Sequence, residues 1–241
     1  MILKTSQGNC GDLCASKHDI TRKDQDDFAI LSYKRATEAW EKGKFDEEVV
    51  PCVTGGRQPK TVSKDEEYSG LKLDKVPSLR AAFNKDGTVT AANASKLNDG
   101  ASAFILASGK FAKEHGLKPL FKIKGFGDAA RDPVEFTIAP ADAVPRALKN
   151  AGMTLGDVHY HEINEAFSVV ALANARLLGL DIDKVNVHGG AVALGHPIGS
   201  SGSRIIGTLY HVLKAQDQSV GCASICNGGG GASAIIIERL N

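Results

Sequence analysis

The second half of this 241-residue sequence predicts an α/β fold in which helices cover a central sheet. Two observations support this prediction. From residue 119 onward, short apolar segments of strand length alternate with longer segments of helical periodicity. Glycines follow several of the helical segments and the ends of several strands, where chains turn into loops. The pattern is typical of a layered α/β domain.

The elements of this second half are expected in a regular order. Strands are expected at residues 120–125, 158–164, 185–188, 221–226 and 234–237. Helices are expected at 141–150, 165–178 and 200–213, and the first two are expected to end at Gly152 and Gly179. In such folds the active site lies where strands run out into loops, so strand ends are the places to search for chemistry.

The first half is less regular and begins with a polar helix. Thr21 is the expected N-cap of this helix, and apolar residues recur at helical spacing up to Gly43. Residues 44–82 lack long periodicity and predict an extended surface segment with a short edge strand. Residues 101–107 are apolar, and their length predicts a buried strand.

Composition excludes several classes of protein. The 29 basic and 28 acidic residues give a net charge of +1, which provides no electrostatic surface for nucleic acid or an anionic membrane. No apolar run approaches the ~18–20 residues of a spanning helix. Residues 1–6 lack the features of a signal or transit peptide. Five cysteines, an odd number, disfavour a disulfide framework and favour a reducing compartment.

The first strand end that could contribute catalytic side chains carries Asn164 and Glu165. Two interpretations are open from the residues alone. Polar side chains at this junction can cap the following helix by accepting its free N–H groups. Alternatively, the Asn164 amide holds a water molecule or a carbonyl oxygen in an active site.

The second strand end leads into a glycine-rich loop, GGAVALGHPIG at residues 189–199. It lacks the Gly-Lys-Ser/Thr ending of a P-loop and the Gly-x-Gly-x-x-Gly dinucleotide pattern. His196 lies between Gly195 and Pro197 just before a helix. A single histidine is often structural, but one fixed in such a loop favours a functional role.

The third strand end is CNGGGGA at residues 226–232. Cys222 and Cys226 are expected on the same face of the strand, with Cys222 in the core. Successive glycine N–H groups can form an anion-binding nest, which would lower the pKa of the Cys226 thiol and stabilise an oxyanion. An alternative zinc site of Cys10, Cys14, Cys222 and Cys226 is disfavoured because the spacing is loose, so no zinc is expected.

These three motifs, in this order, resemble the thiolase family, and within it the short-chain acetyl-CoA acetyltransferases. NEAF at 164–167, the glycine–histidine loop and the cysteine–glycine loop carry the resemblance, and residues 24–29 and 88–95 also match. The resemblance covers essentially the whole chain. It implies a layered α/β/α thiolase-like fold, with residues 119–241 as the C-terminal thiolase domain. Residues 1–118 would be the loop region and the end of the N-terminal domain.

The resemblance also implies roles for individual residues. His196 matches the histidine that activates the family's nucleophilic cysteine and helps form an oxyanion hole. Asn164 matches the asparagine that positions a water in that hole, and Cys226 matches the cysteine that removes or returns the substrate α-proton. Ser95 matches the wall along the pantetheine of coenzyme A, and Lys75 lies near its nucleotide end.

The resemblance implies acetyl-CoA or acetoacetyl-CoA as partners, coenzyme A as substrate, and a homo-oligomer or an association with a full-length thiolase. The mitochondrial matrix is the favoured compartment, with the cytosol as the alternative. The mitochondrial form of the family holds a potassium ion through backbone carbonyl groups, which implies a similar set of ligands here. Phe28 replaces a family tyrosine that helps to hold this ion. These ligands would be Ala91, Ala92, Ala94 and Val192.

Two departures from the family pattern affect the expected activity. SQG at residues 6–8 replaces a substrate-contacting His-Met-Gly, and Cys10 and Cys14 align with a helix rather than with the family's acyl-accepting cysteine. His196 would then have no thiol to activate. The expectation is a thiolase-type acyltransferase that is incomplete or inactive alone. The alternative is a non-catalytic coenzyme A-binding or assembly subunit that pairs with a full-length thiolase.

Overall fold

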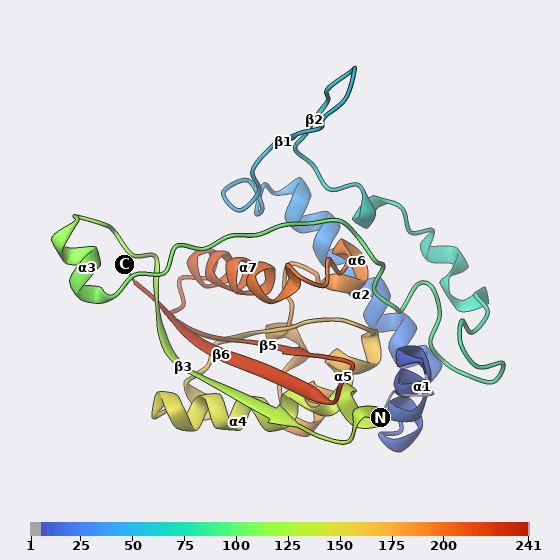
Figure 1. The fold of residues 1–241 in the computed structure, drawn as a ribbon. Helices are drawn as coiled ribbons and strands as arrows, with labels where there is room; N and C mark the ends of the chain where they lie inside the picture. Colours follow the sequence, from blue (N-terminus) through green and yellow to red (C-terminus); the bar gives the residue numbers. More distant parts are fainter. Residues whose placement is uncertain (1–5, 241) are drawn as a thin grey trace.

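The structure, a computed structural model, describes residues 6–240 and contains one four-stranded sheet (Figure 1). Its order is β3 (Phe121–Ala130), β6 (Gly231–Arg239), β5 (Val220–Cys226) and β4 (Tyr160–Ile163). β6 is antiparallel to both neighbours, and β4 runs parallel to β5. The predicted central sheet is therefore confirmed.

Helices α4 (Pro140–Ala151) and α7 (Ser201–Ala215) cover opposite faces of this sheet (Figure 1). Alternate residues of β6 explain the layering. Ala234 and Ile236 pack in the cluster that contains α4, whereas Ile237 packs in the cluster that contains α7. Since successive side chains of a strand point to opposite faces, one strand serves both cores. The predicted α/β/α layering is confirmed.

The helical elements of the first half extend the core beyond the sheet. α1 (Gln7–Lys17) packs with α5 (Ser168–Leu178), and α2 (Arg22–Glu41) packs with α5 and with α6 (Ala191–Leu194). The N-cap expected at Thr21 is confirmed, because its hydroxyl accepts the Asp24 N–H while the Asp24 carboxylate accepts the Thr21 N–H. Glycines Gly152 and Gly179 end α4 and α5 in left-handed conformations, also as predicted.

The remaining elements are short. The β1–β2 hairpin protrudes from the body (Figure 1). The short elements are β1 (Cys52–Val53), β2 (Thr61–Val62), η1 (Glu67–Ser69), η2 (Leu73–Ser78), α3 (Gly109–Glu114), η3 (Pro133–Ile138), η4 (Leu155–Asp157) and η5 (Ile182–Lys184). No helix within residues 6–240 is long and apolar enough to cross a membrane. Residues 1–5, which bear on the expected absence of a targeting peptide, lie outside the described residues.

The buried strand predicted at residues 101–107 is wrong. This segment has no regular secondary structure and is exposed, with Ile105 93% and Leu106 73% accessible. A strand needs a neighbour for its backbone N–H and C=O groups, and no strand of residues 6–240 pairs with this one. The apolar composition of residues 101–107 therefore does not place this segment in the core.

β3 and β6 are longer than the predicted strands at 120–125 and 234–237, and two further elements differ near the strand-end motifs. The strand expected at 185–188 is reduced to a single bridge between Val185 and His161. Beyond that bridge, Asn186 has a φ of 50°, and its side-chain amide bonds the Ile163 N–H and C=O instead of a further strand residue. The helix expected to start at Glu165 starts at Ser168, because residues 164–167 form an extended connection.

Candidate active site

The imidazole of His196 is held on both of its ring nitrogens. Nδ1 lies 2.6 Å from Ser201 Oγ, and Nε2 lies 3.3 Å from Asn164 Nδ2. The backbone is fixed as well, since the His196 N–H donates to the Lys96 carbonyl at 2.8 Å. Gly195, with a φ of 85°, makes the turn that places the ring here.

The hydrogen-bond pattern favours one histidine tautomer. The Ser201 hydroxyl has one proton, which it donates to the Pro197 carbonyl at 3.1 Å. The imidazole Nδ1–H then donates to Ser201 Oγ, and Nε2 accepts from the Asn164 amide. An unprotonated Nε2 is the form of histidine that can accept a proton from a reacting group.

The surroundings keep this imidazole neutral. Burial lowers the pKa of His196, and the positive charge of Arg204 lowers it further. Both effects disfavour the imidazolium ion. The ring is therefore available as a base at neutral pH.

Asn164 is positioned by the sheet rather than by a helix. It directly follows β4, and its N–H donates to the Ser224 carbonyl of β5 at 2.9 Å. The residue is 1% exposed, and its Oδ1 has no hydrogen-bond partner within residues 6–240. A buried amide oxygen in this state is an acceptor directed at a water or ligand.

The capping interpretation of Asn164 and Glu165 is wrong. The N-cap of α5 is Phe167, and no side chain of the described residues caps this helix. Glu165 instead accepts three hydrogen bonds from other segments, from Ser32 Oγ (2.7 Å), Asn186 Nδ2 (2.8 Å) and the Val192 N–H (3.1 Å). It is fully buried. Its carboxylate thus anchors the glycine-rich loop, a role that sequence reasoning missed.

Cys226 and Asn164 lie at the carboxyl ends of the neighbouring strands β5 and β4. β4 and β5 are parallel with Ile163 opposite Ser224, so Asn164 and Cys226 both lie just beyond that pair. Cys222 is buried, as expected, and Cys226, expected as a reactive thiol at the strand end, is buried as well. Cys226 packs in a cluster with Cys10 and Cys14.

The expectation that glycine N–H groups lower the pKa of Cys226 is wrong. Burial raises the pKa of this thiol to about 12. The turn uses several of its own donors, because Gly230 N–H bonds the Asn227 carbonyl and Gly229 N–H bonds Asn227 Oδ1, both at 3.1 Å. In this structure Cys226 is a protonated thiol rather than a thiolate.

The two residues matched to coenzyme A binding lie in different surroundings. Ser95 is beside the site, since its N–H and Oγ both bond the Ala166 carbonyl, at 3.0 and 2.9 Å. Lys75 is exposed in η2, and its Nζ lies 3.6 Å from Asp74. Of the proposed potassium positions, Ala92 and Val192 are buried, Ala94 is half-buried and bridges Phe167, and Ala91 is exposed.

The four thiols weighed for zinc are not gathered in one place. Cys222 packs in the cluster beneath α4, whereas Cys10, Cys14 and Cys226 pack together in another. Within residues 6–240, no three or more His, Cys, Asp or Glu residues are arranged to hold a metal ion.

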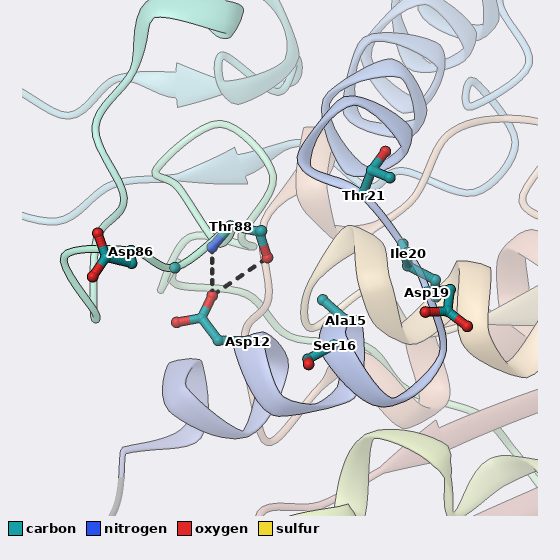
Figure 2. Close-up of a pocket in the computed structure, with 9 residues that line it drawn as sticks. Asp12, Ala15, Ser16, Asp19, Ile20, Thr21, Asp86 and Thr88 are labelled. Carbon is teal, nitrogen blue, oxygen red and sulfur yellow. Dashed lines mark hydrogen bonds between the residues drawn. The ribbon is translucent and has the colours of Figure 1, made fainter.

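A cavity of about 380 Å³ lies away from His196, between α1, the start of α2 and residues 86–88 (Figure 2). Figure 2 shows Asp12 directed at Thr88 across this cavity. The Asp12 carboxylate accepts the N–H groups of Thr88 (2.8 Å) and Val89 (2.9 Å). Asp12 therefore ties α1 to this loop, and the cavity does not adjoin the strand ends described above.

Burial predicts the order in which the cysteines react. Cys52 is exposed in β1, whereas Cys10, Cys14, Cys222 and Cys226 are buried. We expect iodoacetamide at neutral pH to modify Cys52 at least about tenfold faster than the other four, measured by peptide mass spectrometry. A Cys52→Ser variant should then show almost no early labelling. Rapid labelling of Cys226 in the folded chain would contradict its assignment as a buried thiol.

Comparison with known proteins supports these motifs. The family model of the thiolase C-terminal domain matches residues 117–239, and that of the thiolase N-terminal domain matches residues 2–110. An acetyl-CoA acetyltransferase from Schizosaccharomyces pombe is 56% identical over 97% of this chain and 60% of its own length.

Two solved structures are similar to this one. An acetyl-CoA acetyltransferase from Bacillus anthracis has a TM-score of 0.96 and 42% identity, covering 99% of this chain and 61% of the other. The Acat5 thiolase of Ascaris suum in complex with coenzyme A has a TM-score of 0.88 and 44% identity, covering 98% and 60%. The chain thus spans about three fifths of the length of these relatives.

Proposed function

This chain belongs to the thiolase family, and from that premise we propose that it carries the acid/base part of a thiolase-type acyl-CoA acyltransferase site. The reaction is the thiolysis of acetoacetyl-CoA or the condensation of two acetyl-CoA molecules, which the names of its relatives support. The observation that carries the proposal is the neutral His196 ring held between Ser201 and Asn164, with Asn164 Oδ1 left as an acceptor.

His196 and Asn164 serve the carbonyl of the substrate. Nε2 takes a proton from a thiol nucleophile and then, as N–H, donates to the oxygen that becomes negative. Asn164 Oδ1 accepts from a water that donates to the same oxygen. Buried and fixed hydrogen-bond donors stabilise the transition state most where charge develops during the reaction. The side chains of His196 and Asn164 are held in place by the contacts described above.

Cys226 serves the α-carbon. In thiolysis the sulfur of the nucleophilic thiol bonds to C3 of the 3-ketoacyl thioester, and the C2–C3 bond then breaks, leaving the acyl group on that sulfur. The electron pair of the broken bond forms the enolate of acetyl-CoA, and the Cys226 S–H proton goes to C2. A pKa near 12 makes Cys226 a proton donor in the resting chain, which suits this direction. Condensation needs the reverse transfer, so it should be favoured at higher pH.

Coenzyme A is the proposed thiol substrate, because the similar Acat5 thiolase of Ascaris suum was solved in complex with coenzyme A. Ser95, beside the Ala166 carbonyl, would border the pantetheine, and Lys75 would reach the nucleotide. The potassium site at Ala91, Ala92, Ala94 and Val192 stays a prediction.

We propose further that the chain does not form an acyl-enzyme alone. Burial raises the pKa of both Cys10 and Cys14, and both pack in an apolar cluster rather than against His196. A full-length thiolase that carries the nucleophile would complete the site, and self-association as a homo-oligomer is the alternative assembly. The relatives include enzymes named as mitochondrial and as cytosolic, and the matrix is our proposed compartment, with the cytosol as the alternative.

The second candidate function is a non-catalytic coenzyme A-binding or assembly subunit. Exposed apolar side chains favour it, because Leu97, Ile105 and Phe126 are 83%, 93% and 64% accessible. Large apolar side chains exposed in this way are the kind that a partner protein would cover.

Acetoacetyl-CoA thiolysis separates the two functions. The purified chain is assayed with coenzyme A, alone and with a full-length thiolase whose own turnover is subtracted. Turnover that His196→Ala and Cys226→Ala each lower at least about 100-fold supports the enzyme. Coenzyme A binding or co-purification with the thiolase, without added turnover, supports the subunit.

A further inference from the structure

One face of α7 carries a buried polar stripe that the proposed reaction does not explain. Ser201, Arg204 and Thr208 are spaced at i, i+3 and i+7, so they lie along one side of the helix. Ser201 and Thr208 are fully buried, and the Arg204 side chain is 17% exposed. Polar side chains at such positions need partners, and each has one in a different segment.

The three partners belong to the site and its surroundings. Ser201 contacts His196, Arg204 Nη1 lies 3.9 Å from Glu162 Oε2, and Thr208 donates to Glu48 at 2.6 Å. Glu162 precedes Asn164 by two residues, so both face the side of the sheet that α7 covers, where Tyr160 also packs. The stripe therefore joins α7 to the strand that carries Asn164.

Stability does not account for the Arg204–Glu162 pair. Arg204 Nη1 and Nη2 and Glu162 Oε2 are buried and form no hydrogen bond within residues 6–240. Burial raises the pKa of Glu162 well above its usual range, which favours the neutral carboxyl group, so the pair gains little stability from charge attraction. The charged groups around Glu162 are Arg204, Glu48, Glu165 and Arg35, and Arg204 also acts on His196.

We propose that Arg204 is a positioning residue for His196: paired with Glu162, it holds α7 against β4 and places a fixed positive charge one helical turn from Ser201, which contacts the imidazole. The helix then presents Ser201 to Nδ1 while the strand presents Asn164 to Nε2. The positive charge opposes protonation of the ring before substrate arrives. The inference rests on the proposed function only in treating His196 as the base.

The test is an NMR titration of the intact chain with isotope-labelled histidine, in which His196 is identified by the loss of its signal in His196→Gln. Arg204→Met should move the His196 midpoint to higher pH, because the cation that disfavours the imidazolium is gone. Arg204→Lys should return the midpoint toward that of the unchanged chain, since it keeps the charge. This rescue separates a charge effect from a general loosening of the site.

Lys214→Met is the matched control, because Lys214 lies on the same helix and its charge acts on His211. It should leave the His196 midpoint in place. If Arg204→Met does not fold, Arg204→Gln, which replaces the charge with a neutral polar side chain, answers the same question. An unchanged His196 midpoint in either folded neutral variant, or no return with lysine, would overturn the proposal. The titration needs no substrate, so failure of thiolysis leaves its result standing.

Discussion

Replacing Glu165 with alanine should lower the free energy of unfolding by about 3–5 kcal/mol. The substitution removes the acceptor of three buried donors, on Ser32, Asn186 and the Val192 backbone. Each unsatisfied buried donor costs about 1–3 kcal/mol. A loss of this size is a large fraction of the stability of a typical domain.

Urea unfolding measures this effect directly. Glu165→Gln should cost less than alanine, because it keeps the side-chain volume and one carbonyl acceptor. Glu41→Ala, at the exposed end of α2, is the control and should change stability by less than about 0.5 kcal/mol. A loss below about 1 kcal/mol in Glu165→Ala would mean that the carboxylate does not anchor the loop.

The second large effect is a loss of stability in acid, caused by His161 and His188. Burial lowers the pKa of each to about 4, and the positive charges of Lys44 and His211 also act on His188. In the unfolded chain a histidine titrates near 6.5, so below that pH the unfolded state binds protons that the folded state refuses. Above about pH 6.5 neither histidine lowers the free energy of unfolding, and this free energy falls as the pH decreases from about 6.5 towards 4.

Each histidine should therefore lower the free energy of unfolding by about 3 kcal/mol at pH 4 relative to neutral pH. The buried carboxyls Glu162 and Glu165 act in the opposite direction, because burial raises the pKa of each and their protonation relieves a cost. A variant comparison isolates the histidines. His161→Leu with His188→Leu should flatten the fall in unfolding free energy between about pH 6.5 and 4.

Urea unfolding at a series of pH values measures this slope. The exposed His115, on the residue after α3, supplies the control, and His115→Gln should keep the slope of the unchanged chain. An equally steep slope in the double variant would show that the two rings do not titrate as buried groups.

Local signals predicted much of the fold. The Thr21 cap and the glycine ends of α4 and α5 depend on neighbouring residues, which a sequence displays directly. The segment 101–107 was mispredicted because strand formation depends on a distant partner. The strand at 185–188 failed for a related reason, since the Asn186 side chain takes the hydrogen bonds that further strand residues would make.

The candidate site was predictable in its residues but not in its electrostatics. The strand-end motifs located Asn164 and His196, which the structure brings into contact, and Cys226 at the same sheet edge. Burial of Cys226 by α1 and α5 is a long-range effect, so the direction of its pKa shift was missed. The role of Glu165 was missed as well, because its three donors come from distant segments. Arg204 was also missed, although Glu162, two positions before Asn164, and the helical spacing of Arg204 from Ser201 were available signals.

Proton exchange at the methyl group of acetyl-CoA tests the central claim most directly, because it isolates the step assigned to Cys226 from acyl transfer. The intact chain is incubated with acetyl-CoA in deuterium oxide, and incorporation is followed by mass spectrometry. We expect exchange by the unchanged chain to exceed that of Cys226→Ala and to be slower in His196→Ala and Asn164→Ala. The difference should rise about tenfold per pH unit as the thiolate fraction grows below a pKa of about 12. Equal incorporation by the unchanged chain and all three variants at every pH would contradict the assignment of this site.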